Sequence, residues 1–474
     1  MTSATALSTS TDRRRPALMM LCLVQFMLVL DDTVVNVALP SVRDELGFTT
    51  AGLAWVVNAY FLAFGGLLLL SGRAADLLGR RRVFLSGVAV FGVASLACGL
   101  AQEPWHLVVA RFVQGGGAAM AGPAALSLIS LMYTGAEERA RAFGLWGAIA
   151  GLGGTMGLVI SGALTGLASW RWIFLINLPV AAIAVVLVPR LVTESRSPRR
   201  ARLDISGAVL GTGAVLSLVL GLLRAGETGW GNVTVIGPLL LAAVLAAAFL
   251  AVEARTADPL VPLPFLANRT RAVADVTSLM FSAAFYAMAF LLMLHMQTVL
   301  DYGPLKAGFA YLPYGAGILT GMWLAPRAVA GFGTRWTLVA GFLLGAAGLL
   351  MLSGMSPNDP YALGVLPGVL VASLGGGLSL PTLTVAAIGG TTEDNAGLGS
   401  AILTSVQQVG GAVGLSVLVA LAAQRTDAVA DSTGPQDAAT DGFALALMVA
   451  AALLALGALV IATLLDGRRE STSA

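Results

Sequence analysis

Apolar runs of membrane-spanning length follow one another along almost the whole chain, separated by short polar segments. A helix needs about 20 consecutive apolar residues to cross the hydrocarbon core of a bilayer. By this criterion the pattern predicts about fourteen helical spans, which makes the expected fold an all-α polytopic membrane protein. The spans are residues 17–39, 51–71, 83–102, 106–132, 142–166, 172–192, 205–223, 234–252, 272–298, 307–326, 336–354, 361–388, 398–423 and 443–464.

The composition supports a membrane location and excludes several functional classes. Hydrophobic residues make up 57% of the chain and charged residues only 11%, whereas a soluble domain carries about 25% charged residues. Much of the surface must therefore face lipid. No basic stretch with interleaved aromatic residues indicates a nucleic-acid partner. The two cysteines and two histidines do not cluster, so we expect no disulfide, no metal site and no cofactor.

The placement of arginine predicts an orientation. When the N-terminus is placed in the cytoplasm, most of the 27 Lys and Arg residues fall in cytoplasmic segments. Short cytoplasmic loops of membrane proteins carry such an excess of basic residues. Because the number of predicted spans is even, both termini are then cytoplasmic.

A weak internal repeat divides the chain. The fourth span carries glycines at 115–117 followed by Pro123, and the twelfth carries glycines at 375–377 followed by Pro381. Spans one to six thus echo spans nine to fourteen, and spans seven and eight are inserted between them. Two six-helix halves with a binding site near the membrane midplane are typical of secondary transporters. The expected parts are a cytoplasmic tail (1–16), an N-terminal half (17–192), a linker with two inserted helices (193–270), a C-terminal half (271–465) and a second cytoplasmic tail (466–474).

Two adjacent carboxylates, Asp31 and Asp32, lie within the first span. Placing a carboxylate inside a span costs about 2.5–3.5 kcal/mol, and such residues are usually functional. Burial and a neighbouring carboxylate both favour the protonated form, so we expect at least one of the two to exchange a proton near neutral pH. Adjacent helix positions point ~100° apart, so the two do not face the same cavity. The sequence leaves open which one titrates.

Arg111 enters the fourth span at a depth close to that of Asp31, because this span runs in the opposite direction. An arginine at that depth needs a partner or water. We therefore hypothesise that Arg111 pairs with Asp31 or Asp32, and that protonation of the aspartate releases the pair. Gln114, one turn deeper, is expected to extend the relay.

Several motifs resemble those of the fourteen-helix drug:proton antiporter branch of the major facilitator superfamily, over roughly residues 17–465. They are LDDTVVNVALP at 30–40, GRAADLLGRRR at 72–82, RFVQGGG at 111–117, WRWIFLINLP at 170–179 and SVQQVGG at 405–411. The resemblance implies the major facilitator fold, a proton role for Asp31, Arg111 and Gln114, and a monomer in the bacterial cytoplasmic membrane. Asp32 stands at a variable position of the family motif.

The loop at 72–82 carries the strongest signature of the superfamily. Gly79 permits a tight turn, Asp76 can cap a helix or hold an arginine, and the arginines meet anionic lipid headgroups. In relatives this loop stabilises one conformation. We therefore expect a conformational latch formed by Gly72, Asp76, Gly79, Arg80 and Arg81.

The fifth span is rich in glycine and resembles the antiporter motif of the family. Small residues allow helices to pack closely in lipid. Leu158 stands where the motif has proline, and Ser161 replaces a glycine, so the sequence predicts close packing and leaves the proline kink open. The motif-like glycines are Gly147, Gly151, Gly154, Gly157 and Gly162.

Two further features are interpreted as structural. Tryptophans favour membrane interfaces, so the segment 170–179 is expected to lie at an interface. Asp275 follows Arg271 by four residues, and oppositely charged side chains at this spacing pair on a helix. Only Asp31 and Asp32 are then clear candidates for functional acids within the membrane.

Candidates for the substrate cavity come from several spans. A surface of methionine and aromatic side chains suits varied apolar ligands, and a histidine near the outer end can titrate. Packing in the core or against lipid is the alternative for each. The candidates are Asn36, Tyr60, Phe285, Tyr286, Met288, His295, Gln407 and Gln408.

The predicted function is proton-coupled efflux of drugs, antibiotics or other small hydrophobic molecules across the cytoplasmic membrane by alternating access. An importer, or a translocator of lipids or metabolites, is the transporter alternative. A membrane-embedded enzyme is the non-transporter alternative, but no metal constellation, phosphate loop or nucleophile–base pair favours it. The expected partners are a drug-like small-molecule substrate that is hydrophobic or cationic, protons and membrane lipids.

Overall fold

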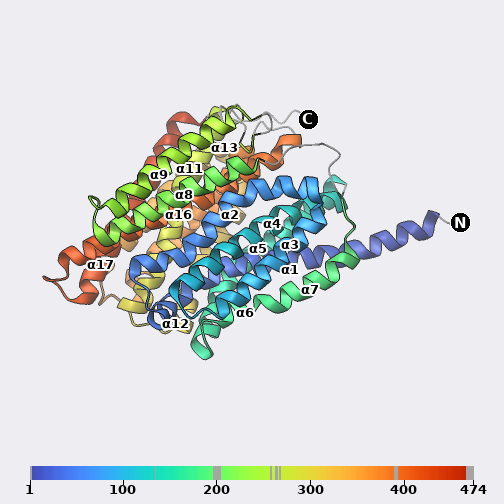
Figure 1. The fold of residues 1–474 in the computed structure, drawn as a ribbon. Coiled ribbons are helices and arrows are strands. Elements are labelled where there is room, and N and C mark those ends of the chain that lie inside the picture. The colour runs from blue at the N-terminus through green and yellow to red at the C-terminus, as the bar shows by residue number, and fades with distance from the viewer. Residues whose placement is uncertain are drawn as a thin grey trace.

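A computed structural model describes residues 3–133, 135–195, 204–256, 259–261, 265, 268–388 and 393–465. In these residues the regular structure is helical, and the long helices run side by side as a bundle (Figure 1). The elements are α1 (Ser3–Leu46), α2 (Thr50–Leu78), α3 (Arg80–Gly99), α4 (Pro104–Met132), α5 (Ala136–Leu167), α6 (Trp172–Leu175), α7 (Asn177–Leu191), α8 (Ile205–Thr228), α9 (Val233–Glu253), α11 (Arg269–Leu294), the π-helix η1 (His295–Val299), α12 (Pro304–Ala310), α13 (Leu312–Ser353), α14 (Tyr361–Gly364), α15 (Leu366–Ile388), α16 (Glu393–Val429) and α17 (Pro435–Leu464).

The number of spans agrees with the sequence prediction once one long segment is divided. Within the described residues, 13 helical segments are long and apolar enough to cross a membrane. One of them, Pro304–Ser353, contains 50 residues and is therefore ~75 Å long, more than twice the thickness of a hydrocarbon core. Gly333 interrupts it with a φ of 79°, a conformation that glycine adopts without steric cost. The segment thus supplies the two predicted spans 307–326 and 336–354.

Several helices extend beyond the apolar runs that predicted them. The helix α1 begins at Ser3 and ends at Leu46, whereas the expected span is 17–39. The helices α16 and α17 begin at Glu393 and Pro435, ahead of the expected starts. Hydropathy detects the part of a helix that lies in lipid, but backbone hydrogen bonding continues into the polar flanks. Residues 196–203 of the predicted linker and the predicted tail 466–474 lie outside the described residues.

The helices form two six-helix halves with an inserted pair. In the first half α4 packs on α2 and α3, and α1 packs on α5; in the second, α13 packs on α15 and α17, and α11 packs on α16. The inserted helices α8 and α9 pack on each other, and α8 covers both α2 and α16. Figure 1 shows this pair along one flank of the bundle.

Two helix pairs join the halves. The helix α2 packs along α16, and α5 packs along α12. In the first interface the side-chain amide of Asn58 donates a hydrogen bond of 2.9 Å to the Ser416 hydroxyl, and both residues are fully buried. In the second, the backbone approach is close enough that a Cβ on Gly162 would lie 2.7 Å from the carbonyl oxygen of Pro304.

Candidate functional site

A buried ion pair joins α1 to α4 in the interior of the first half. Nη1 of Arg111 lies 2.7 Å from Oδ2 of Asp31, and the two side chains are 1% and 0% exposed. The structure therefore brings together the two residues that the sequence expected to meet, and it pairs Arg111 with Asp31 rather than with Asp32. Removing one partner of such a pair leaves an uncompensated buried charge.

Three polar side chains complete the network around Asp31. The amide of Gln114 donates to Oδ1 of Asp31 at 2.8 Å, and the amide of Asn177 donates to the same oxygen at 2.7 Å. Both amides also donate to the Ser95 hydroxyl, at 2.7 and 3.3 Å. Arg111 in turn donates to Oε1 of Gln114 at 2.8 Å. Two helices, α4 and α7, thus donate the hydrogen bonds that stabilise the charged form of the Asp31 carboxylate, and Ser95 links the two amides from α3.

The other sides of the Arg111 guanidinium group are also occupied. Its Nε donates to the carbonyl oxygen of Val56 at 3.0 Å. The ring of Tyr60 lies 4.4 Å from the guanidinium carbon, within range of a cation–π contact. This arrangement needs α2 and α4 close together, and a Cβ on Gly115 would lie only 2.3 Å from the carbonyl oxygen of Tyr60. The glycine beside Gln114 therefore permits the helix contact that holds the arginine.

Asp32 lies outside this network. Its Oδ1 is enclosed and has no hydrogen-bond partner among the described residues. Its neighbour Thr33 turns its hydroxyl back to the carbonyl oxygen of Leu30 at 3.0 Å. The two adjacent carboxylates thus have different surroundings, as the ~100° step between helix positions requires.

The expected pair between Arg271 and Asp275 is wrong. Arg271 donates to the carbonyl oxygens of Ala387 and Phe265 at 3.2 and 2.6 Å and stacks over the Phe265 ring at 3.6 Å. Asp275 is 6% exposed, and neither of its carboxylate oxygens has a hydrogen-bond partner in the described residues. Two backbone carbonyl oxygens and the face of the Phe265 ring take the place of the local carboxylate at the guanidinium group of Arg271. The predicted span 272–298 therefore contains a buried acid near its start.

The loop at 72–82 forms a tight connection between α2 and α3. Gly79 has a φ of 116°, and Asp76 accepts a hydrogen bond of 2.9 Å from Nε of Arg80. The backbone N–H groups of Arg81 and Arg82 donate to the two carboxylate oxygens of Glu194, each at 3.1 Å. A carboxylate in this position satisfies free N–H groups and the positive end of the helix dipole.

Two members of the expected latch have other surroundings. A Cβ on Gly72 would meet open space, so no close approach requires glycine there. The guanidinium of Arg81 donates to the carbonyl oxygens of Val192 and Pro189 at 3.0 and 3.3 Å. Arg81 therefore ties the loop to the end of α7.

The motif-like glycines of α5 fall into two groups. A Cβ on Gly157 would lie 2.1 Å from the hydroxyl of Thr33 on α1, and Gly162 is in tight contact with α12. Gly151 and Gly154 leave ordinary van der Waals space, and Gly147 faces open space. The helix continues without a break from Ala136 to Leu167. Close packing is thus concentrated in the half of α5 near α12.

Ser161 and Leu158 take specific positions on this helix. The Ser161 hydroxyl donates to the carbonyl oxygen of Val34, which ties α5 to α1. The carbonyl oxygen of Leu158 would lie 2.7 Å from a Cβ on Gly308, so the residue in the place of the motif proline contributes its backbone to the contact between halves.

The substrate-cavity candidates do not share one environment. Tyr60 lies against Arg111, and its neighbour Phe61 meets Tyr286 across the halves with ring centroids 4.5 Å apart. The side chain of Gln408 packs beside α2, where its Cβ would lie 2.7 Å from a Cβ on Gly65. These residues bring α2, α11 and α16 together.

The other candidates lie apart from this contact. Phe285 stacks on Phe281 at 4.4 Å inside the second half, and Met288 is 0% exposed. His295 is fully buried near Phe443, and neither ring nitrogen has a hydrogen-bond partner among the described residues. Asn36 donates weakly to the carbonyl oxygen of Thr33 at 3.5 Å. Gln407 lies in α16 and is partly buried.

The segment 170–179 belongs partly to the site, which corrects its purely structural interpretation. Trp170 is 2% exposed, and its indole N–H donates to Glu45 at 2.6 Å. Trp172, at 52% exposure, fits an interfacial position. Asn177 reaches Asp31 and was missed by sequence reasoning. The signal that could have identified Asn177 is its place as a polar residue within a predicted span and within a motif of the family.

Comparison with known proteins decides the family. The family model described as Major Facilitator Superfamily matches residues 21–415. The chain belongs to the Major Facilitator Superfamily. A solved bacterial homolog of the human lysosomal transporter Spinster superposes with a TM-score of 0.70 at 17% identity, covering 97% of this chain and 99% of that one. This likeness shows the shared fold.

Relatives with higher sequence identity indicate which members of the superfamily this chain resembles. The puromycin resistance protein pur8 of Streptomyces alboniger is 38% identical over 97% of this chain and 93% of its own length. The lincomycin resistance protein of Streptomyces lincolnensis is 39% identical over 85% and 83%, and the cephamycin export protein CmcT of Amycolatopsis lactamdurans is 37% identical over 90% and 88%. The expected resemblance to drug-efflux members of the superfamily is thereby confirmed.

Proposed function

We propose that this chain exports antibiotic-like small molecules across the cytoplasmic membrane in exchange for protons. Three of its relatives are named for antibiotic resistance or antibiotic export. The excess of arginine in alternate connecting segments supports cytoplasmic termini. We expect a monomer divided at residues 17–192, 193–270 and 271–465. Arg82, whose side chain is 66% exposed, is available to anionic lipid headgroups.

The observation that carries the proton role is the buried pair of Arg111 with Asp31. The carboxylate accepts hydrogen bonds from Arg111, Gln114 and Asn177. A proton on Asp31 removes the negative charge that holds Arg111, and it places an O–H where three donors now converge. The network must then rearrange, which gives the first half two states that a proton can bias.

The free energy available to this exchange is sufficient for export. Each proton moving down a membrane potential contributes about 2.3 kcal/mol per 100 mV, and a tenfold concentration ratio corresponds to about 1.4 kcal/mol. One proton per substrate therefore sustains a large outward gradient. The halves would alternate around the contacts of α2 with α16 and of α5 with α12.

Efflux of ethidium from a bacterium that lacks its own pumps tests this function. We expect export to stop on addition of a protonophore and in the Asp31→Asn variant, which keeps the shape of the side chain but not its charge. Asp441→Asn is the matched control, because Asp441 pairs with Arg425 on the surface at 53% exposure. Membrane protein levels are compared by immunoblot.

The Asp32→Asn variant separates the two carboxylates. Because Arg111 pairs with Asp31, we expect this variant to retain coupling to the proton gradient. Export that survives Asp31→Asn and fails in Asp32→Asn would move the proton role to Asp32. Uptake rather than export of the dye would favour the importer alternative.

A further inference from the structure

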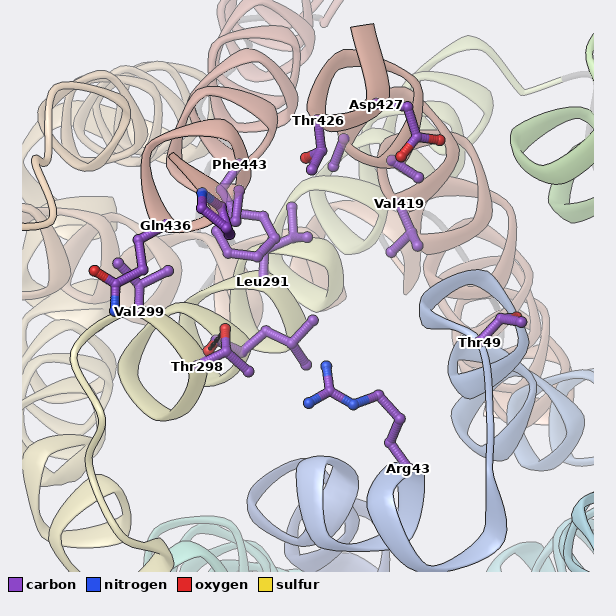
Figure 2. A pocket seen from close by; sticks show the side chains of 15 residues that line it. Arg43, Thr49, Leu291, Thr298, Val299, Val419, Thr426, Asp427, Gln436 and Phe443 are labelled. Atoms are coloured by element: carbon purple, nitrogen blue, oxygen red, sulfur yellow. Dashed lines mark hydrogen bonds between the residues drawn. The ribbon is translucent and has the colours of Figure 1, made fainter. Parts of the chain in front are cut away.

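A second site of ligand size lies at the end of the bundle opposite the N-terminus, between the two halves. Its volume is ≈ 570 Å³, within the usual range of small-molecule pockets. Figure 2 shows the end of α1 on one side and α11, η1, α16 and α17 on the other. Arg43 lies twelve positions after Asp31 on α1, hence ~18 Å along the helix. The pocket is therefore distinct from the buried ion pair.

A contact between the halves lies on the path from this pocket toward Asp31. The amide of Gln297, in η1, donates to the carbonyl oxygen of Val37 at 2.9 Å, and Val37 itself is 0% exposed. Along α1, Val37 lies between Asp31 and Arg43. A molecule in the pocket thus touches both halves while the helices beneath it stay in contact.

Nine of the fifteen residues that line the pocket are apolar, and the other six are polar or charged. Leu291, Leu294 and Val299 of α11 and η1 line the pocket together with Val419 of α16 and Phe443 of α17. Figure 2 shows Phe443 close to Leu291, and Val419 apart from them. Part of this wall is the π-helix η1; such wide turns often occur at functional sites. The apolar area suits the body of an organic molecule rather than a hydrated ion.

Two opposite charges face the pocket from different halves. Arg43 of α1 extends into the space, and Asp427 of α16 lies on the far side (Figure 2). Nε of Arg43 binds the carboxylate of Asp44 at 3.1 Å, and its terminal nitrogens make no hydrogen bond with the part of the chain that the structure describes. No ion pair joins Arg43 to Asp427 among the described residues, so the terminal nitrogens of Arg43 and the carboxylate of Asp427 are available to a ligand.

We propose that this pocket binds amphoteric small molecules, with an anionic group at Arg43, a cationic nitrogen near Asp427 and an apolar body on Leu294 and Phe443. The charges select among ligands, and the apolar walls supply affinity. Because the two charges belong to different halves, a bound molecule links the halves at this end. Its affinity then depends on the conformation of the transporter. The proposed pocket does not depend on the direction of transport. Its test measures binding, so it can fail or succeed whatever the outcome of the export experiments.

Rhodamine B and its ethyl ester test this proposal, because they differ in one carboxylate and share a cationic ring system. Fluorescence anisotropy measures their binding to the purified full-length protein in detergent, with empty micelles as the blank. We expect the wild type to bind rhodamine B about fivefold more tightly than the ester, as a partly exposed ionic contact allows. Arg43→Gln should abolish this preference, and Asp427→Asn should weaken binding of both dyes.

Matched variants distinguish the pocket from charged groups elsewhere in the protein. Arg425→Gln removes the same charge at the same end of the bundle but outside the pocket, and it should keep the preference. Asp32→Asn, in the interior, should also keep it. Equal binding of the two dyes by the wild type, a preference that survives Arg43→Gln, or one that is lost in Asp32→Asn would each overturn the proposal.

Thiol labelling locates the bound dye. Both native cysteines are buried, so a cysteine introduced by Ala423→Cys, in the pocket wall, is the accessible target. Rhodamine B should slow its reaction with a non-fluorescent charged maleimide more than the ester does at equal concentration. A labelling rate that neither dye changes, although rhodamine B binds, would place the dye elsewhere and overturn the assignment.

Discussion

Arg111 lies in the interior of the helix bundle with partners on several sides of its guanidinium group. Asp31 neutralises its charge, the Val56 carbonyl oxygen accepts from Nε, and the Tyr60 ring covers one face. Such enclosure makes the group sensitive to the charge of a single carboxylate, because little water can replace the lost partner. The proposed coupling between protonation of Asp31 and the position of Arg111 rests on this burial.

A double-substitution experiment measures this dependence. Arg111→Gln should destabilise the purified protein by about 3–5 kcal/mol, because it leaves Asp31 charged, buried and short of its partner. Adding Asp31→Asn should recover most of the loss, since the remaining groups are neutral amides that can bond to one another, but it should not restore export. Thermal unfolding in detergent and ethidium efflux provide the two measurements.

The exposed pair of Arg425 with Asp441 is the control for this experiment. Its side chains are 46% and 53% exposed, so Arg425→Gln should change stability by less than about 1 kcal/mol. If Arg111→Gln were no more destabilising than Arg425→Gln, the buried pair would not have the energetic role assigned to it.

Part of the residue-scale account could be predicted from the sequence. Counting residues along two antiparallel spans places Asp31 and Arg111 at the same depth, and an unpaired charge there is costly. Asn177 could not be placed in the same way. Its contact with Asp31 spans 146 positions and depends on how α7 packs on α1, which span counting does not give. The predicted partner of Arg271 was wrong for a related reason. Its actual partners are backbone carbonyl oxygens, which every residue has, so the sequence does not indicate which of them will be near.

At the scale of elements, the connection between α2 and α3 depends on one glycine and one distant acid. Gly79 takes a backbone conformation that disfavours other residues, and Glu194 accepts from two N–H groups at the start of α3. The turn was predictable from the motif. Glu194 was not, because it follows α7 and approaches the loop only in the folded bundle.

Gly79→Ala tests the strain at this turn. We expect a loss of about 1–3 kcal/mol, since the backbone conformation is unfavourable for alanine and its Cβ would lie 2.8 Å from the Glu194 carboxyl group. Gly72→Ala, in the same motif but facing open space, should have little effect on thermal unfolding. Equal unfolding temperatures for the two variants would contradict this account of the loop.

The glycines of α5 allow a second comparison within one element. A Cβ at Gly162 would meet the backbone of Pro304 and Leu305 in the other half, and backbone cannot move aside as a side-chain end can. Gly162→Ala should therefore lower the rate of ethidium export several-fold at equal expression. Gly147→Ala, which faces open space, should leave the rate unchanged, and the reverse order would refute the packing argument.

At the scale of the whole molecule, two helix pairs and one inserted pair determine how the halves meet. The helices α2 with α16 and α5 with α12 join the halves, and α8 covers the first of these pairs. The number of spans and their grouping followed from hydropathy and from the repeated glycine and proline positions. The pocket at the end opposite the N-terminus did not, because its walls come from three regions far apart in sequence, 43–49, 291–299 and 419–443.

The central claim is that Asp31 couples the export of substrate to the inward movement of protons. Its most direct test is substrate-triggered proton movement in liposomes containing the purified protein and a trapped pH-sensitive dye, with ethidium added outside and no imposed gradient. The wild type should show a proton flux that depends on ethidium, Asp32→Asn should retain it, and Asp31→Asn should lose it while still binding ethidium. An undiminished flux in Asp31→Asn would contradict the account.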